Sequence, residues 1–358
     1  MRVDGRFDNA MTNLHAGRNI LVTGAGGWIG SALTKALARD EPRKLILLDH
    51  SERSLYRVDA ELAALQGSVS HKSILGDLGD AKLLEEIFEM YGPEIVYHAG
   101  AYKHVPLLED NPIAAIRNNA LGTNTLAEAA ERHRASTLVM ISTDKAVEPA
   151  SILGASKRVA ELALMRWDTP ITPMKALRLG NVFGSEGSVV SAFRQQISQG
   201  GPVTVTHPDA ERYFVPLEKV LELIFLVRQL SDGGGIFVPD LGAPVRIVDV
   251  AKQLMAEVPA ASGEEVPIEF TALRPGDKKT EKMFGRSEWL QATSDNRLAR
   301  VRTSRDCLER YDILIRELAK GVDERDLASV IEVLRKFVPD YNPSEELLSL
   351  RENPAAKI

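Results

Sequence analysis

The sequence predicts an α/β protein built around a doubly wound, mostly parallel β-sheet. In the first half of the chain, short runs of β-branched residues and leucine alternate with amphipathic segments of helix length. A glycine-rich turn also joins the first predicted strand to the first predicted helix. Strands separated by helices of this length pair in parallel through right-handed crossovers, so helices are expected on both faces of the sheet.

The predicted elements follow this alternation in order. Short apolar runs, which are typical of buried parallel strands, predict strands at 19–23, 44–48, 73–75, 95–98, 137–142 and 174–179. The segments between them predict helices at 31–39, 55–65, 81–91, 112–132 and 151–167. The second half is less regular, with a loop and helix at 180–201, strands at 203–206 and 236–238, and helices at 218–230, 246–257, 305–318 and 323–337. The tail at 342–358 is polar.

Composition and charge limit the classes of function. The 358 residues are 44% hydrophobic and 26% charged, which is ordinary for a globular protein. The single cysteine, Cys307, excludes a disulfide framework and a cysteine-based zinc site. A net charge of −6 without a basic block argues against nucleic acid as the main partner, and no histidine spacing indicates a metal. No apolar run approaches the roughly 18 residues of a membrane span, and residues 1–18 lack a secretory signal, so we expect a cytoplasmic protein.

The glycine-rich turn predicts a Rossmann-type dinucleotide site. It follows the first strand and opens a helix: Gly24 permits the tight turn, Gly27 lets the backbone approach a pyrophosphate, and Gly30 allows close helix packing. Asp49 ends the second strand 19 residues after Gly30, where a carboxylate binds an adenosine ribose. Because a 2′-phosphate would meet this negative charge, we expect NAD, with NADP as the alternative because Arg53 is close by.

Residues that follow the third and fourth strands are further candidates for cofactor binding, because ligands of doubly wound sheets bind at the carboxyl ends of the strands. Asp77 lies where adenine is expected, although a turn-forming Asp is the alternative. The small residues Ala99, Gly100 and Ala101 leave room for a cofactor. Lys103 follows at once, and its alternative role is that of a solvated surface charge.

The stretch after the fifth strand makes a family resemblance specific. It contains Ser142-Thr143-Asp144-Lys145, and Leu153-Gly154-Ala155-Ser156-Lys157 opens the next helix. Together with HAGAYKHVPLLEDNP, GPVTVTHPDAERYF and LRPGDK, these residues resemble extended short-chain dehydrogenases/reductases. Within that superfamily they are similar to the nucleotide-sugar 4,6-dehydratases of the polysaccharide-biosynthesis (capsule) group, which act on UDP-N-acetylglucosamine. The matching segments spread over about three quarters of the chain.

The resemblance implies a reaction and roles for four residues. Oxidation at carbon 4 of the hexose acidifies the hydrogen on carbon 5, the carbon 6 hydroxyl leaves, and hydride returns to carbon 6. Thr143 would bind the carbon 4 oxygen, Asp144 would be the acid for the leaving hydroxyl, and Lys145 the base at carbon 5. Such a base needs a pKa near neutrality, which we expect from burial and from the charges of Lys157 and Lys103. Lys157 would also hold the nicotinamide ribose. The alternative is that Asp144 and Lys145 form a loop ion pair.

The resemblance also implies the remaining binding residues. Additional cofactor contacts are expected from Trp28, Ile29, Ser51, Leu78, Asn119 and Ser142. Contacts to a UDP-sugar substrate are expected from Lys103, Thr143, Asn181, Ser188, Val189, Thr204, Val205, Arg212 and Arg274. A planar, always-charged guanidinium suits a diphosphate, so the two arginines are expected to neutralise it, and surface cations with solvated heads are the alternative.

Two residues depart from the family pattern. Leu153 stands where the superfamily has its catalytic Tyr, and leucine cannot transfer a proton, so Asp144, with or without Thr143, is expected to take the carbon 4 hydroxyl proton. Glu186 stands where the family has Arg. A UDP-hexose epimerase and a non-catalytic cofactor-binding protein remain as alternative functions. The epimerase needs no elimination acid and base, and retention of the Thr143, Asp144 and Lys145 set argues against the non-catalytic protein.

We divide the chain accordingly. The sequence predicts a polar leader at 1–17 and a dinucleotide-binding domain at 18–184, which also includes residues 214–242. A smaller C-terminal substrate-binding subdomain is predicted at 185–213 and 243–300, and a helical segment at 301–358. A homo-oligomer is expected, because members of the superfamily pair through the helices that correspond to 112–132 and 151–167.

Overall fold

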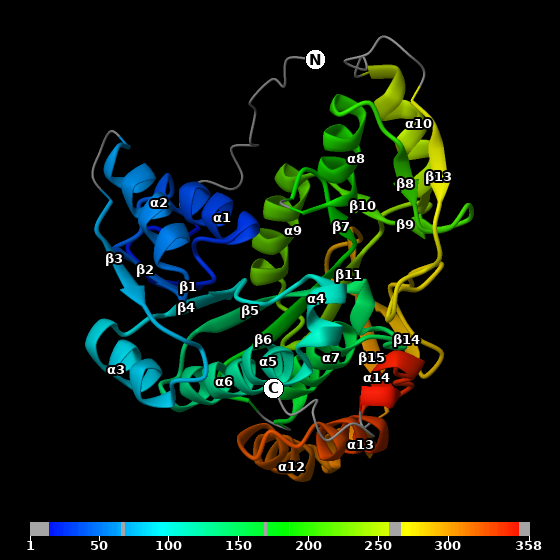
Figure 1. Cartoon of the computed structure of the whole chain (residues 1–358). Helices are drawn as coiled ribbons and strands as arrows, with labels where there is room; N and C mark the ends of the chain where they lie inside the picture. Colours follow the sequence, from blue (N-terminus) through cyan, green and yellow to red (C-terminus); the bar gives the residue numbers. More distant parts are fainter. Residues whose placement is uncertain are drawn as a thin grey trace.

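The computed structural model describes residues 14–65, 69–167, 170–185, 187–257, 266–304 and 306–350 (Figure 1). Glu186, most of the leader at 1–17 and the end of the tail at 342–358, all of which the sequence predictions name, lie outside these ranges. Among the described residues, no helix has the length and apolar character needed to span a membrane.

One large sheet forms the centre of the molecule. In the described part of the chain it has nine strands, in the order β14-β15-β11-β6-β5-β4-β1-β2-β3. The parallel strands are β1 (Asn19–Thr23), β2 (Lys44–Asp49), β3 (His71–Leu75), β4 (Ile95–His98), β5 (Thr137–Thr143), β6 (Met174–Leu179) and β11 (Gly235–Pro239). The hairpin of β14 (Glu288–Ala292) and β15 (Leu298–Thr303) adds to β11 in antiparallel pairing. Residues 288–300, which the sequence division assigned to the smaller subdomain, therefore extend the main sheet.

Helices cover both faces of this sheet. Helices α1 (Trp28–Ala38), α2 (Glu52–Ala63) and α9 (Leu217–Gln229) pack on one face, and α3 (Ala81–Tyr91), α6 (Gly122–Arg132) and α7 (Ile152–Met165) pack on the other. Successive residues of a strand point to opposite faces of the sheet. Ile20 and Val22 of β1 pack against α1, α2 and α9, and Leu21 packs against α3, α6 and α7, as the alternation of side chains along a strand requires.

A smaller lobe stands beyond the carboxyl ends of the strands (Figure 1). It consists of α8 (Val189–Ser198), β8 (Val203–Val205), β9 (Glu211–Arg212), β12 (Val245–Arg246), α10 (Ile247–Glu257) and β13 (Ile268–Phe270). Strands β8 and β13 pair in parallel, and Phe193, Ile197 and Leu254 are buried in the lobe's own core. The short strands β7 (Asn181–Val182) and β10 (Phe214–Val215) pair with each other where the chain passes between the main sheet and the lobe.

The helix predicted at 112–132 is divided in three. It consists of α5 (Pro112–Ala115), a π-helical stretch at Ile116–Leu121 and α6, and α4 (Val105–Asp110) precedes it. A π-helical turn is rare and is found often at functional sites. Here it contains Asn119, whose side chain is fully buried beside α7.

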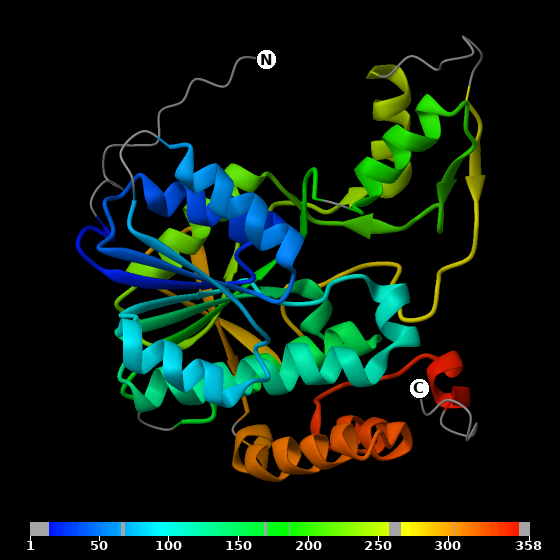
Figure 2. The same ribbon diagram turned by 60° about the vertical axis from the view of Figure 1, so that its left-hand side comes forward.

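The C-terminal helices cover the helices that were expected to pair with a second copy. Figure 2 shows α12 (Tyr311–Asp323) and α13 (Leu327–Phe337) against α5, α6 and α7, with α11 (Asp306–Glu309) before them and α14 (Glu345–Leu350) after them. Leu314, Leu318 and Leu334 are fully buried in one core with Ile116 and Val159. Helix α7 is buried at every residue from position 152 to position 164. Self-association through this face would first require that α12 and α13 leave it.

This packing predicts a large stability effect. Leu318→Ala is expected to lower the free energy of unfolding by about 2–5 kcal/mol, because it removes a fully buried side chain and leaves a cavity. Denaturant unfolding measures the change, with Ile313→Ala as the matched control, because Ile313 lies in the same helix with 46% of its surface exposed. Equal, small effects of the two substitutions would show that α12 does not pack on the core in solution.

Candidate active site

The turn between β1 and α1 is shaped by its glycines. Gly24 has φ +66°, and a Cβ atom there would lie 2.5 Å from Gly100 Cα. A Cβ atom on Gly30 would lie 1.9 Å from Gly24 O, and one on Gly26 would lie 2.5 Å from Ser54. The turn thus packs against the backbone after β4 and against α2, which any larger residue at these three positions would prevent. The sequence interpretation did not single out Gly26.

The N-terminus of α1 is open to an anion. Gly27 is the N-cap residue and has extended backbone angles, and within the described residues neither a capping side chain nor an acidic residue occupies the first turn. Trp28 is 41% exposed and Ile29 is half-buried. The free amide groups and the positive end of the helix dipole suit a phosphate group at this point.

Asp49 fixes the turn through hydrogen bonds and retains acceptor sites for a ligand. Its side chain is nearly buried, and Asp49 Oδ2 accepts a hydrogen bond from Gly26 N at 2.9 Å, while Oδ1 accepts one from Ser51 N at 2.8 Å. A carboxylate has about four acceptor sites, so two remain for hydroxyl groups. Arg53 is exposed on α2, and Arg57, which the sequence interpretation missed, donates to Gly26 O at 3.0 Å.

The other residues expected at the cofactor lie around the same edge of the sheet. Asp77 is exposed and accepts a hydrogen bond from Gly79 N at 2.7 Å, which is the turn-forming arrangement. Leu78 is buried against Gly100 and Gly122. Ala99, Gly100 and Ala101 are half-buried, and Lys103 is exposed.

Asn119 holds the loop after β4 to α7. Its Oδ1 accepts from Tyr102 N at 2.8 Å, and its Nδ2 donates to Tyr102 O and to Ser156 Oγ, each at 3.1 Å. These bonds show how the π-helical stretch positions the backbone beside the expected cofactor.

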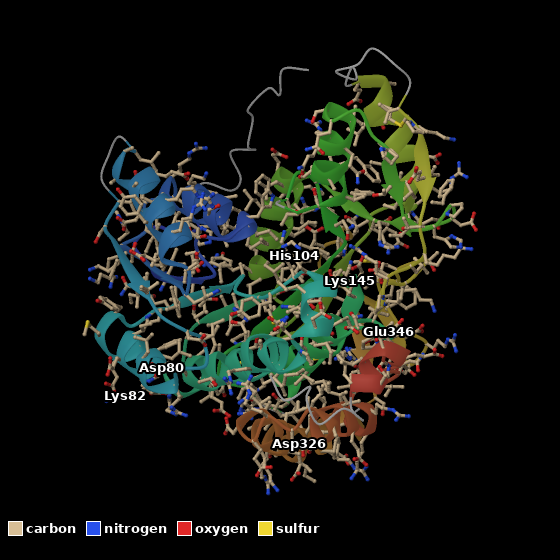
Figure 3. All side chains as sticks on the ribbon, viewed as in Figure 1. Asp80, Lys82, His104, Lys145, Asp326 and Glu346 are labelled. Atoms are coloured by element: carbon tan, nitrogen blue, oxygen red, sulfur yellow. The ribbon has the colours of Figure 1, made fainter. Side chains whose placement is uncertain are left out.

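A compact polar cluster lies at the carboxyl end of β5. Thr143 Oγ1 donates to Asp144 Oδ1 at 2.9 Å, and Lys145 Nζ donates to the same oxygen at 3.0 Å and to Asn181 Oδ1 at 3.2 Å. Asp144 is fully buried, and its Oδ2 has no hydrogen-bond partner within the described residues. A buried carboxylate oxygen without a partner is costly, so it marks a position for a ligand or a transferable proton. Figure 3 shows Lys145 where the main sheet meets the smaller lobe.

The electrostatic environment of Lys145 differs from the sequence prediction. Burial lowers the pKa of the amine, but the carboxylates of Asp144 and Glu281 raise it more, and the net effect is a pKa above the usual value. The prediction relied on nearby cations, whereas the structure also places a second carboxylate, Glu281 Oε1, 3.6 Å from the amine. Sequence reasoning missed Glu281, although it follows the matched Leu273–Lys278 motif by only three residues.

Lys157 is a buried cation one helical turn inside α7. Its side chain donates to Ile141 O at 2.7 Å, and burial lowers its pKa to about 8. Ser142, in contrast, is directed away from the expected cofactor, because its hydroxyl donates to Glu161 Oε1 at 2.7 Å in the interior.

Glu161 belongs to a buried cluster of four charges beneath the site. Arg178 is fully buried and binds Glu161 through two hydrogen bonds of 2.8 Å and Glu288 through two of 2.7 and 2.9 Å. Arg158 lies 2.9 Å from both carboxylates. The cluster connects β5, β6 and α7 with the start of β14.

The residues expected to contact a substrate are divided between two regions. Asn181 contacts the Lys145 amine, and Arg212 donates to the carbonyl oxygens of Glu211, Lys278 and Lys279. The others lie in the smaller lobe or in the 273–278 segment. In the lobe, Ser188 caps α8 and Val189 beside it is half-buried, while Thr204 is exposed and bonds to Gln196 and Val205 is buried. In the 273–278 segment, Arg274 forms an ion pair with Asp277 at 2.9 Å. The side chain of Val205 therefore packs inside the lobe.

One loop brings the two regions together. A Cβ atom on Gly187 would lie 2.5 Å from His104 Cε1, and one on Gly184 would lie 3.5 Å from the Trp28 ring. The segment before α8 therefore contacts both the loop after β4 and the start of α1, across the cluster at the end of β5.

Residues 20–303 match a family described as "Polysaccharide biosynthesis protein". The chain belongs to this polysaccharide biosynthesis protein family. It is 39% identical over 316 residues to the capsular polysaccharide biosynthesis protein CapD of Staphylococcus aureus (87% of this chain, 53% of CapD). It is 44% identical over 281 residues to the probable polysaccharide biosynthesis protein EpsC of Bacillus subtilis (78% of this chain, 47% of EpsC). The chain thus spans about half the length of these two relatives.

Solved structures confirm the fold predicted for this member of the polysaccharide biosynthesis family. Pen from Bacillus thuringiensis aligns with a TM-score of 0.72 at 24% identity, over 81% of this chain and 88% of Pen. WbmG from Bordetella bronchiseptica, solved in complex with NAD and UDP, aligns with a TM-score of 0.60 at 25% identity, over 73% of this chain and 83% of WbmG. The predicted Rossmann-type α/β sheet is therefore correct.

Proposed function

We propose that the chain is an NAD-dependent nucleotide-sugar 4,6-dehydratase that acts on UDP-N-acetylglucosamine. The observation that supports this most directly is the hydrogen-bonded group of Thr143, Lys145 and the fully buried Asp144, which places an acid and a base together at the end of β5. A polysaccharide biosynthesis family and a similar structure that holds NAD and UDP agree with this substrate class.

The chain's own geometry fits NAD. The glycine turn packs closely against the backbone after β4 and against α2, the N-terminus of α1 is open, and Asp49 retains acceptor sites for ribose hydroxyls. The negative charge of Asp49 opposes a 2′-phosphate, which favours NAD over NADP. When bound, NAD would supply the hydride acceptor for carbon 4 and the hydride donor for carbon 6.

Three side chains would handle the protons. Leu153 is buried and apolar, so Asp144 accepts the proton of the carbon 4 hydroxyl and later donates it to the hydroxyl that leaves carbon 6 as water. Thr143 orients the carbon 4 oxygen. Lys145, as the neutral amine, removes the carbon 5 proton and returns it to that carbon after hydride reaches carbon 6. The sum is the loss of one water from the sugar nucleotide.

Product analysis tests this function. Purified protein with NAD and UDP-N-acetylglucosamine is expected to give a product that has lost one water, as shown by its mass and by a new methyl signal in the proton NMR spectrum. Lys145→Met is expected to abolish the product, and Lys82→Met, an exposed site on α3, is expected to retain it. An isomer of equal mass would support the epimerase, and no turnover of any UDP-hexose would support a non-catalytic protein.

A further inference from the structure

A carboxylate from a distant part of the chain is buried beside Lys145. Glu281 has a side chain that is 2% exposed, and its Oε1 lies 3.6 Å from Lys145 Nζ. Its Oε2 forms an ion pair with Lys278 Nζ at 2.9 Å. The Lys145 amine therefore lies between two carboxylates, because Asp144 Oδ1 accepts from it at 3.0 Å.

The segment around Glu281 is held on more than one side. Lys278 Nζ donates at 2.8 Å to the carbonyl of Val147, two residues after Lys145. The guanidinium of Arg212 donates to the carbonyls of Lys278 and Lys279 at 2.7 and 3.1 Å. These bonds fix Glu281 relative to the end of β5, so its distance to Lys145 is a feature of the fold.

We propose that Glu281 is a positioning residue for Lys145: its buried carboxylate, anchored by Lys278, holds the ammonium group between Asp144 and Asn181. The role of Lys145 as a base rests on the proposed function, whereas the contact itself does not. The charged groups that face the amine are Asp144 at the end of β5, Glu281 from the 278–281 segment and Arg212 from β9. Lys278 faces Glu281 from the other side.

This arrangement controls the proton on the amine. Burial favours the neutral amine, but the two carboxylates favour the ammonium, and the pKa of Lys145 is raised overall. The ammonium must lose its proton before it acts as a base. Removing the charge of Glu281 takes away one of the two groups that hold this proton, so the amine becomes a base at lower pH. An opposite charge at this distance moves a pKa by about one to three units.

The test is a titration of Lys145 that needs no substrate. Full-length protein is labelled with lysine carrying ¹³C at Cε, and the Lys145 signal is identified by its absence in Lys145→Arg. In Glu281→Gln, which keeps the size of the side chain, the pKa of Lys145 is expected to fall by about one to three units. Glu148→Gln is the matched control, because Glu148 is a nearby carboxylate that pairs with Lys282 and Arg286, and it should leave the titration unchanged. An unchanged titration in Glu281→Gln would overturn the proposal.

A second variant has the opposite expected sign. Lys278→Met removes the cation that shares Glu281, while the bonds from Arg212 to the carbonyls of residues 278 and 279 still hold the segment. The carboxylate then interacts more strongly with Lys145, and the pKa of Lys145 is expected to rise. If Glu281→Gln does not fold, the titration of Lys145 in Lys278→Met decides. A raised pKa of Lys145 supports the proposal, and an unchanged or lowered pKa overturns it.

Activity is measured separately. If the dehydratase function holds, the rising limb of the pH–rate profile of Glu281→Gln should move to lower pH by the same amount as the titration. A titration shift without any dehydration in the wild-type protein would retain the role of Glu281 and overturn the proposed function. Dehydration by the wild-type protein, together with an unshifted Lys145 titration in Glu281→Gln, would retain the proposed function and overturn the role of Glu281.

Discussion

Replacement of Asp144 by Asn is expected to reduce the dehydration of UDP-N-acetylglucosamine by about 10²–10⁴-fold, the usual contribution of a positioned acid–base group. Asparagine keeps the shape of the side chain but cannot accept the carbon 4 hydroxyl proton. Leu153, at the position of the superfamily's catalytic tyrosine, is buried and apolar and cannot take this proton instead. The loss of rate should appear in the first chemical step, the oxidation of carbon 4.

Single-turnover absorbance of the reduced nicotinamide measures that step. Asp144→Asn should form reduced nicotinamide slowly or not at all, whereas Asp323→Asn, an exposed position at the end of α12, should behave as the wild-type protein does. Rapid oxidation of carbon 4 by Asp144→Asn would mean that another group takes the proton, and the assignment would be wrong.

The second large effect is expected at the buried charge cluster. Arg178→Met should lower the free energy of unfolding by about 3–5 kcal/mol, because it leaves Glu161 and Glu288 buried with only Arg158 between them. Arg286→Met, which removes an 85% exposed arginine side chain nearby, is the matched control. Similar denaturant midpoints for the two variants would contradict the prediction.

The same cluster predicts how stability depends on pH. Burial raises the pKa of Glu161, but Arg178 outweighs it and holds the pKa at about 2, below the usual value of 4.5. A carboxylate with a lowered folded-state pKa stabilises the fold above its unfolded pKa and loses this contribution as pH falls toward its folded pKa. The wild-type protein should therefore lose stability between about pH 4.5 and pH 2 more steeply than Arg178→Met.

The main sheet could be predicted from the sequence because each of its strands is specified by residues that are neighbours in the chain. Runs such as 20–22 and 45–48 are apolar at every position, which is typical of strands covered on both faces. Gly30 was predictable for the same reason, since its neighbour Gly24 lies in the same turn, whereas Gly24 also packs against Gly100 after β4. No strands were predicted at 288–303, and residues 288–300 were placed in the smaller subdomain, because the exposed Trp289 and Leu290 give no pattern that specifies which sheet edge they join.

The features that sequence reasoning missed depend on contacts between distant segments. Glu281 meets Lys145 only because the 278–281 segment folds back over the end of β5. The direction of the Ser142 hydroxyl depends on Glu161, which is itself held by Arg178 from β6. The break of the 112–132 helix into a π-helical stretch follows no propensity, and it accompanies the bonds that Asn119 makes to Tyr102 and Ser156.

The burial of α7 affects how the protein opens. Its side chains pack against the sheet on one side and share a core with α12 and α13 on the other, so we expect its amide hydrogens to exchange only when large parts of the fold open. We therefore expect α7 to belong to the last cooperative unit to exchange its amides, and the smaller lobe, which has a core of its own, to open at lower free energy. Lys157, which lies on α7, should then stay in place while the smaller lobe opens.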